Sequence, residues 1–335
     1  MSNMNSKTIT ISKGVEMPLI GFGTFQTANL DPERFESSLE EALKCGYRHI
    51  DTAYLYQNED IVGKVVNRWI SNGLVKREDL FITTKLPLTG VHPDRVEFFL
   101  NKSLKNLGLK YVDLYLVHYP ICLKFDEVNN FPSDESGRLF TEPTDHVAVW
   151  KKMEEQVDSG KARSIGLSNF NQSQITKILN IARIKPANLQ IEIHVYFQNH
   201  EIVDFCKKNG ISVVAFSPLG CPAFNEFNKR VGLPTSETPN LMEDPVVVAI
   251  AKKHSKTPAQ VLLRYLIERG LATIPKSLNH ARIKENIDIF DFRLDNDDMS
   301  KLTSLNRGGT SKVVDLTKFK GLTDHPEYPY KEYLI

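Results

Sequence analysis

The sequence predicts an α/β fold, a (β/α)8 TIM barrel with an N-terminal β-hairpin, extra helices and long loops at its C-terminal rim. Eight short apolar segments alternate with helical segments along the 335 residues. The apolar segments are continuous, as in Val213-Val214-Ala215-Phe216, which is typical of parallel strands covered by helices. Right-handed β-α connections leave an open doubly wound sheet or a closed barrel, and eight units with a sealing hairpin favour the barrel.

Local signals mark the ends of these elements. Residues 8–18 alternate around a glycine-containing turn and predict the hairpin. Asp31-Pro32 opens the first helix, because proline is favoured in the first helical turn. Gly160 and Gly210 each follow a helical segment and suit its C-terminal cap. Thr257-Pro258-Ala259-Gln260 has the spacing of a capping box and starts another helix.

The whole chain, 1–335, is expected to form one domain. Two long segments, 121–143 and 217–243, are expected to be active-site loops, because barrel enzymes have their active sites at the C-terminal rim. Residues 306–335 are expected to form an irregular C-terminal loop. The strands are expected at 19–23, 47–51, 80–85, 112–118, 163–168, 188–193, 211–216 and 271–275. The helices are expected at 32–45, 59–72, 93–107, 144–159, 171–182, 200–209, 244–254, 258–269, 279–289 and from 295.

The bulk composition is that of an ordinary globular protein. Lys and Arg total 42 and Asp and Glu total 41, so the net charge of +1 indicates no nucleic-acid or anionic-membrane partner. No apolar run approaches the ~18 residues that span a membrane, and the polar N-terminus has no signal-peptide core. The four cysteines lack metal-ligand spacing and indicate reduced thiols. We therefore expect a cytoplasmic protein without a metal site.

Four chemically active side chains are expected at the C-terminal rim. Asp51, Lys85 and His118 end three successive predicted strands, and Tyr56 follows the first strand. A phenol with a pKa near ~10 is a poor acid at neutral pH, and a nearby ammonium is expected to lower that pKa. Asp51 would keep Lys85 charged, and His118 could hydrogen-bond a substrate oxygen. The set suits proton donation to an oxygen that gains negative charge, as in carbonyl reduction.

Each of these residues also has a purely structural explanation. Asp51 and Lys85 suit a salt bridge between strands, Tyr56 is one of eleven tyrosines, and His118 suits a histidine satisfied in the core. Their placement at corresponding ends of successive strands favours the catalytic interpretation. The set has no serine or cysteine nucleophile with a base, and no metal-ligand spacing.

Two segments are candidates for cofactor binding. Gly21-Phe22-Gly23 starts like a dinucleotide fingerprint, but the third glycine and the helix start are missing, so it fails as a Rossmann motif. At the last strand, Ile274-Pro275-Lys276-Ser277 meets a helix start, where barrels commonly bind phosphate. Lys276 and Arg282 could hold a phosphate there, and a solvated basic helix start is the alternative.

Taken together, these residues resemble the aldo-keto reductase family. The resemblance extends from the hairpin to about residue 305 and implies an NADPH-dependent carbonyl reductase. Tyr56 would then donate the proton, and Asp51 and Lys85 would adjust the pKa of Tyr56. His118 would position the carbonyl. The motifs that carry it are Gly46 to Glu59, the strand end at Lys85, His118, Gly166-Leu167-Ser168-Asn169-Phe170 and Ile274-Pro275-Lys276-Ser277.

The resemblance also implies contacts to cofactor and substrate. Ser168, Asn169 and Gln190 match residues that hold the nicotinamide amide. The full set of implied cofactor contacts is Gly23, Thr24, Ser168, Asn169, Gln190, Phe216, Ser217, Leu219, Lys276, Ser277, Asn279, Arg282, Glu285 and Asn286. Of these, Lys276, Ser277 and Arg282 match residues that bind the 2′-phosphate. The implied substrate pocket is lined by Phe25, Leu55, Tyr119, Phe131 and Phe224.

The chain departs from the family pattern at several positions. Phe216 stands where many members stack a tyrosine on the nicotinamide, so the ring is kept without its hydroxyl. Asn279 replaces a threonine of NADPH-specific members and could bond a free ribose hydroxyl, which suggests secondary NADH use. Ala223 replaces an acidic residue that helps to hold the cofactor, so faster release is expected. Tyr119 and Pro87 stand where tryptophan is common, so the pocket is expected to be wider or differently shaped.

The expected function is reduction of an aldehyde or ketone to an alcohol, with hydride from NADPH and a proton from Tyr56. Simple aldehydes, aldoses and 3-keto steroids such as ecdysteroid precursors remain open as substrates, and the protein is expected to be a monomer or a homodimer. One alternative is a Schiff-base aldolase using Lys85, although the pairing with Asp51 keeps that lysine protonated. The other is a non-catalytic NADPH-binding sensor or scaffold.

Overall fold

A curled sheet of parallel strands forms the centre of the molecule. The computed structural model describes residues 7–26, 29–127, 129–235 and 240–331. All neighbouring strands of the eight-stranded sheet are parallel, as the barrel prediction requires. In sheet order they are β3 (Phe22–Gly23), β4 (His49–Asp51), β5 (Phe81–Leu86), β6 (Val112–Val117), β9 (Ala162–Ser168), β10 (Asn188–Glu192), β11 (Ser212–Phe216) and β12 (Ala272–Thr273).

The first and last strands close this sheet into a barrel. Ile20, just before β3, forms a parallel bridge with Thr273 in β12. The amide of Gly23 donates to the carbonyl of Pro275 over 3.0 Å and extends the seam toward the rim. A Cβ atom on Gly23 would lie 2.7 Å from the carbonyl oxygen of Ile274, so a side chain there would push the strands apart. The predicted (β/α)8 barrel is therefore confirmed.

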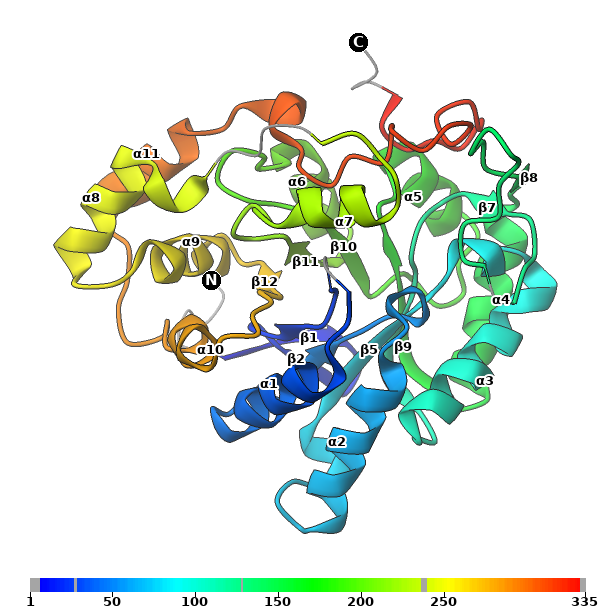
Figure 1. Cartoon of the computed structure of the whole chain (residues 1–335), viewed down its shortest axis with the longest axis horizontal. Helices are drawn as coiled ribbons and strands as arrows, with labels where there is room; N and C mark the ends of the chain where they lie inside the picture. The colour runs from blue at the N-terminus through cyan, green and yellow to red at the C-terminus, as the bar shows by residue number, and fades with distance from the viewer. Residues whose placement is uncertain (1–6, 27–28, 128, 236–239, 332–335) are drawn as a thin grey trace.

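Helices cover the outside of the sheet, as Figure 1 shows. Among the described residues no helix is both long and apolar enough to cross a bilayer. The helices are α1 (Pro32–Lys44), α2 (Glu59–Ser71), α3 (Val96–Leu107), α4 (His146–Asp158), α5 (Gln172–Leu179), α6 (His200–Lys208), α7 (Phe224–Arg230), α8 (Pro245–His254), α9 (Pro258–Glu268), α10 (His280–Ile287) and α11 (Asn296–Ser304).

Several predicted helix ends agree with the observed caps, although the helix expected at 171–182 already ends at Leu179. Thr257 and Gln260 form the expected capping box of α9, each side chain bonding the other residue's amide, at 3.2 and 3.0 Å. Gly160 and Gly210 follow α4 and α6 with φ of 72° each, a conformation that favours glycine. The helix expected at 93–107 begins instead with a 3-10 turn, Pro93–Arg95, before α3.

The two long loops each contain a short element of regular structure. Segment 121–143 contains an antiparallel pair, β7 (Cys122–Leu123) and β8 (Thr141–Glu142). Segment 217–243 contains α7, whose Phe224 and Phe227 stack with ring centroids 5.4 Å apart and are buried. A seven-residue helix has too few residues for a clear period in the sequence. Residues 236–239 of this loop, and 332–335 of the C-terminal loop, lie outside the described residues.

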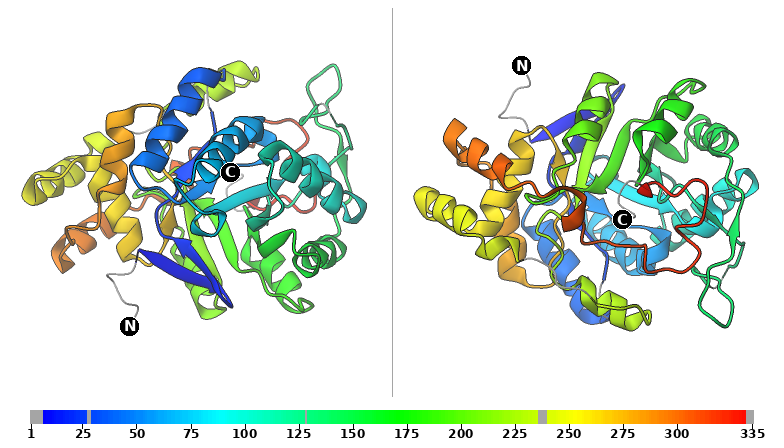
Figure 2. Two further views of the ribbon diagram at one scale, coloured as in Figure 1. Left: turned by 90° about the horizontal axis from the view of Figure 1, so that it is seen from below. Right: turned by 90° about the horizontal axis from the view of Figure 1, so that it is seen from above.

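A hairpin seals the end of the barrel opposite the active site. It pairs β1 (Thr8–Ser12) with β2 (Val15–Pro18), and Met17 on it is fully buried. The hydroxyl of Ser12 lies 2.7 Å from that of Ser164, which stands near the start of β9. The hairpin therefore lies at the N-terminal ends of the strands, as the view from below in Figure 2 shows.

The C-terminal segment, residues 306–331, crosses the other end of the barrel (Figure 2, right). It is irregular apart from a 3-10 turn, Gly308–Ser311, in agreement with the prediction. The carboxylate of Glu192, at the end of β10, accepts from the amides of Val313 and Val314 over 2.6 and 2.9 Å. The amide of Leu139 donates to the carbonyl of Lys320 over 2.9 Å, which joins this segment to the loop that holds β7 and β8.

Candidate active site

Four side chains meet at the C-terminal ends of β4, β5 and β6. Asp51 is the last residue of β4, Lys85 is in β5, and His118 follows β6 directly. Tyr56 ends a 3-10 turn, Tyr54–Tyr56, just beyond β4. Since these three strands are parallel neighbours, their ends converge on one rim. The structure thus brings together the four residues that the sequence singled out.

The ammonium of Lys85 is fully buried and has all its donors engaged. Its Nζ lies 2.6 Å from Asp51 Oδ1, 2.9 Å from the carbonyl oxygen of Thr52 and 3.3 Å from the Tyr56 hydroxyl oxygen. The other carboxylate oxygen of Asp51 accepts from Gln190 Nε2 over 2.7 Å. Because an ammonium has three protons, this geometry uses every one of them.

Burial and charge set the protonation states of the site. Burial acts to lower the pKa of Lys85, but the Asp51 carboxylate and Tyr56 outweigh it, so the pKa is raised and the ammonium stays charged. Burial raises the pKa of the Tyr56 phenol, and Lys85 only partly opposes this rise. The expectation of a lowered Tyr56 pKa is therefore wrong for this structure. The pKa of His118 is well below its usual value, mainly through burial and secondly through Lys85, so its imidazole is neutral.

Tyr56 and His118 face the same cavity. Their ring centroids lie 5.6 Å apart in an edge-on arrangement, and both side chains line the cavity. The Tyr56 oxygen accepts a hydrogen bond from Lys85, so the phenol's own proton is available to the cavity. His118 Nδ1 is buried and has no hydrogen-bond partner in the described part of the chain. The rim can thus present two polar groups to one substrate oxygen.

A cavity of about 600 Å³ extends from these residues to the start of α10. Lys85 is buried and does not line the cavity, whereas every other predicted site residue does. The lining includes Gly23, Thr24, Phe25, Asp51, Leu55, Tyr56, His118, Tyr119, Phe131, Ser168, Asn169, Gln190, Phe216, Ser217, Leu219, Phe224, Lys276, Ser277, Asn279, Arg282, Glu285 and Asn286.

The far end of the cavity is cationic. Lys276 and Arg282 line it, as predicted, and Arg34 in α1 joins them without any signal in the sequence. No described carboxylate lies within salt-bridge distance, 4.0 Å, of any of the three. Burial lowers the pKa of Lys276, as expected for an ammonium with no close counter-ion. These uncompensated cations fit the phosphates of a dinucleotide.

The middle of the cavity carries amide and hydroxyl groups beside an aromatic ring. Ser168 and Asn169 stand at the end of β9, Gln190 in β10 and Phe216 at the end of β11. Asn169, Ser217 and Cys221 have positive φ of 63°, 50° and 41°, and all line the cavity. Left-handed backbone at non-glycine residues is strained and is often concentrated at binding sites. These groups fit a flat ring that carries an amide.

Asn279 uses the oxygen of its carboxamide inside the protein. Its side-chain oxygen accepts from the amide of Arg282 over 3.1 Å and caps the N-terminus of α10. Glu285, another implied cofactor contact, accepts from the Thr257 hydroxyl over 2.6 Å. The helix cap uses only the oxygen of Asn279, so it leaves the amide nitrogen for the suggested contact with a ribose hydroxyl.

The near end of the cavity is apolar. The five predicted substrate residues lie there, packed in a second hydrophobic cluster separate from the barrel core. Phe25 contacts Tyr56 and Phe227, with ring centroids 5.2 and 5.5 Å apart. Phe131 stacks on Phe319 of the C-terminal segment, 5.0 Å away.

The C-terminal segment supplies cavity residues that the sequence analysis missed. They are Lys312, Val314, Leu316, Phe319 and Leu322. No periodicity marks this segment, so its placement depends on the folded barrel. Glu192, which fixes the segment, did have a signal: it is a charged residue that ends an apolar strand, like Asp51.

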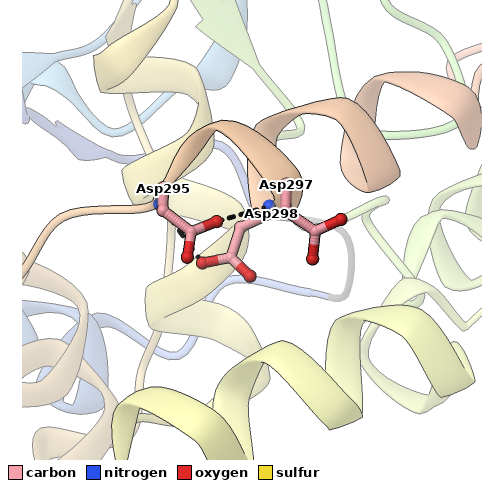
Figure 3. A group of neighbouring side chains, drawn as sticks. All are labelled: Asp295, Asp297 and Asp298. Atoms are coloured by element: carbon pink, nitrogen blue, oxygen red, sulfur yellow. Dashed lines mark hydrogen bonds between the residues drawn. The ribbon is translucent and has the colours of Figure 1, made fainter.

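A cluster of carboxylates lies away from the cavity, on α11 (Figure 3). Asp295 and Asp298 form a capping box, and both also bind Lys253, at 2.6 and 2.8 Å. Asp297 binds Lys301 over 2.6 Å. The cluster is thus explained by a helix cap and its ion pairs.

The fold and the cavity define a class of protein, a (β/α)8 oxidoreductase with a phenol, an ammonium, a carboxylate and an imidazole at one strand rim. The chain belongs to the aldo/keto reductase family, whose sequence profile matches residues 19–307. This confirms the resemblance seen in the sequence. Members of this family reduce carbonyl groups and typically use NADP(H).

Curated relatives match over nearly the full chain. Aldo-keto reductase family 1 member C4 of Homo sapiens is 43% identical over 326 residues, 97% of each chain. Prostaglandin F synthase 1 of Bos taurus is 42% identical over 330 residues, 98% of each chain. Among solved structures, the aldose reductase of Schistosoma japonicum is similar with a TM-score of 0.86 and 41% identity, covering 97% of this chain and 98% of that one.

Proposed function

We propose that this protein reduces an apolar aldehyde or ketone with NADPH, and that Tyr56 donates the proton to the carbonyl oxygen. The observation that carries the proposal is the 3.3 Å hydrogen bond from Lys85 to the Tyr56 oxygen, in a cavity that also has uncompensated cations. When bound, NADPH supplies the hydride that reduces the carbonyl carbon. The side chains of the rim position the carbonyl, donate the proton and stabilise the tyrosinate that remains.

Tyr56 and His118 act on the carbonyl oxygen. The raised pKa of Tyr56 keeps its proton in place at neutral pH, which is the form that reduction requires. The neutral His118 donates or shares a hydrogen bond with the same oxygen and fixes its position. As the oxygen gains negative charge, the phenol proton moves to it. The tyrosinate that remains is stabilised by the ammonium of Lys85, which Asp51 keeps charged.

The cofactor residues follow from the cavity. Lys276, Ser277 and Arg282 are proposed to hold the 2′-phosphate, because the cations lack partners there. Ser168, Asn169 and Gln190 are proposed to hold the nicotinamide amide, and the Phe216 ring to stack on it. Because Lys276, Arg282 and Arg34 gather at the far end of the cavity and suit an added phosphate, we propose a preference for NADPH with only minor NADH use.

A bulky apolar substrate fits the near end of the cavity better than an aldose. The lining there consists of aromatic and aliphatic side chains, including Tyr119, Phe131, Phe224 and Phe227. Each hydroxyl of a sugar placed against them would lose its water without gaining a partner, which costs about 1–3 kcal/mol per group. Of the candidates, apolar aldehydes and 3-keto steroids are favoured over aldoses.

The two alternatives have weaker support. A Schiff base requires a neutral, accessible amine, whereas Lys85 is fully buried and its three donors are engaged. A sensor that binds NADPH without consuming it would not need a phenol beside a buried ammonium. We further propose that the chain acts as one barrel domain in the cytoplasm, as a monomer or a homodimer.

Loss of NADPH absorbance with a panel of carbonyl compounds tests the proposal. We expect oxidation of NADPH with apolar aldehydes and cyclic ketones, slower oxidation with aldoses, and slower rates with NADH at equal concentration. Binding of NADPH without consumption by any compound would favour the sensor. Borohydride trapping of a substrate on Lys85 would favour the aldolase, and a preference for aldoses would contradict the apolar pocket.

A further inference from the structure

Tyr330, near the end of the described chain, contacts a residue proposed to bind the cofactor. Its hydroxyl donates a hydrogen bond to Asn169 Oδ1 over 2.9 Å, although 161 residues separate the two in sequence. Asn169 Nδ2 donates to the backbone oxygen of His118 over 3.0 Å and to Ser168 Oγ over 3.1 Å. The carboxamide of Asn169 is therefore held on both sides, by the barrel at its nitrogen and by the C-terminal segment at its oxygen.

This arrangement decides what Asn169 can offer to a ligand in the cavity. An amide nitrogen has two protons, and both are used inside the protein. The oxygen can accept two hydrogen bonds, and Tyr330 supplies one of them. Asn169 lines the cavity, so its remaining capacity is that of an acceptor for an N–H group. A carboxamide NH2 is such a donor.

Tyr330 is itself fixed by its neighbours. The ammonium of Lys312 lies 4.6 Å from its ring centroid, a cation–π contact, and 3.8 Å from the Glu192 carboxylate. The carbonyl of Pro329 accepts from Asn171 Nδ2 over 3.2 Å. The contacts of Tyr330 thus connect the ends of β9 and β10 through the C-terminal segment, which also lines the substrate end of the cavity.

We propose that Tyr330 is a positioning residue that orients the Asn169 carboxamide to accept a hydrogen bond from the nicotinamide carboxamide. The C-terminal segment then shapes both ends of the site, the substrate end through its apolar side chains and the cofactor end through one hydroxyl. This inference rests on the proposed function, because it assumes that a nicotinamide dinucleotide binds in the cavity.

The test compares two cofactors in equilibrium binding. Calorimetry measures the Kd of NADP+ and of its 3-acetylpyridine analogue, in which a methyl ketone replaces the carboxamide and no N–H is available. For Tyr330→Phe, which removes only the hydroxyl, we expect the Kd of NADP+ to rise about 3- to 10-fold, the effect of one hydrogen bond. The Kd of the analogue should change less than about 2-fold. In an Asn169→Ala background, Tyr330→Phe should have no further effect.

Glu327→Gln is the matched control, because Glu327 anchors the same segment without touching the rim. It accepts from Gln174 Nε2 and Lys177 Nζ over 3.0 and 3.1 Å. We expect this variant to leave the ratio of the two Kd values unchanged, and urea unfolding midpoints show that all variants are folded. The role of Tyr330 would be overturned if Tyr330→Phe changed the Kd of both cofactors equally or changed neither. It would also be overturned if Glu327→Gln showed the same selective loss of NADP+ affinity. If the unaltered protein binds neither cofactor, the proposed function itself fails.

Discussion

The ammonium of Lys85 donates a hydrogen bond to the phenol oxygen of Tyr56 over 3.3 Å. The direction of this bond matters, because it leaves the phenol proton pointing away from Lys85, toward the cavity. It also places a positive charge where negative charge develops when that proton leaves. The contact therefore assigns different roles to the two residues: Tyr56 transfers the proton, and Lys85 stabilises the anion that remains.

Removal of the Asp51 charge should weaken the stabilisation that Lys85 gives to the Tyr56 anion. In Asp51→Asn, burial acts on Lys85 without the opposing carboxylate, so the pKa of Lys85 should fall. We expect kcat to fall at least about 10-fold, less than the roughly 100-fold minimum for a proton-transfer group itself, because Asp51 acts through Lys85. Stability should fall by about 3–5 kcal/mol, as for a broken buried pair. The kcat of the variant should fall further as pH rises through the lowered Lys85 pKa.

Steady-state kinetics and urea unfolding check these effects. Asp60→Asn is the control, because Asp60 is exposed on α2. A variant of Asp51 with normal kcat and stability would show that the buried pair is dispensable.

The pH profile of reduction should be flat across the neutral range. Reduction needs protonated Tyr56, and its pKa is raised, so activity is lost only as pH rises above the ordinary tyrosine value of about 10. His118 has a pKa well below its usual value, so it stays neutral through pH 6. The measurement is kcat/KM for the carbonyl at saturating NADPH from pH 6 to 10. A decline centred near pH 7 or 8 would contradict the assigned protonation states.

Glu192 should stabilise the C-terminal segment above acidic pH. Burial acts to raise its pKa, but Lys312, His194 and the Val313 amide outweigh this, so the pKa is lowered. A lowered folded-state pKa contributes stability that is present above the unfolded value, about 4.3, and is lost as pH falls through the folded value. Glu192→Gln should therefore cost about 1.5–3 kcal/mol at pH 7, the range for hydrogen bonds to a charged group, and less at pH 3.

Urea unfolding at the two pH values and limited proteolysis of the C-terminal segment measure the effect of Glu192. Glu201→Gln, at an exposed position on α6, is the control. Equal losses at both pH values would show that the charge of Glu192 is irrelevant to the fold.

The apolar end of the cavity should select substrates by size. Phe131→Ala removes a ring that stacks on Phe319, so it should raise KM for a bulky apolar ketone about 10-fold, given about 1–3 kcal/mol for a buried apolar side chain. A short aldehyde does not reach that ring and should be affected less than about 2-fold. Phe140→Ala, at an exposed phenylalanine outside the cavity, is the control. Equal effects on both substrates would place Phe131 outside the substrate site.

The barrel and its rim were predictable because their signals are local. An apolar run that ends in a charged residue marks a buried strand with a functional end, as at Asp51 and Lys85. Glu192 carries the same signal, yet it is absent from the predicted site, because its partner is a stretch of chain more than a hundred residues away. The pKa direction of Tyr56 could not be predicted either, since it depends on how completely the folded cavity removes water from the phenol.

The C-terminal segment was the least predictable part. Val314, Leu316 and Phe319 have no periodicity, and their place in the cavity follows from contacts with a finished barrel. The helix α7 was missed for a similar reason, because its burial comes from Phe224 and Phe227 meeting the same apolar cluster.

The most direct test of the account is Tyr56→Phe, measured for NADPH binding and for carbonyl reduction in the same preparation. The phenyl ring keeps its contacts with Phe25 and His118 and loses only the transferable proton. We predict an NADPH Kd within about 2-fold of the unaltered protein and a kcat reduced by at least about 100-fold, as general acids contribute about 100- to 10,000-fold. Unchanged turnover with normal NADPH binding would contradict the assignment of Tyr56 as the proton donor.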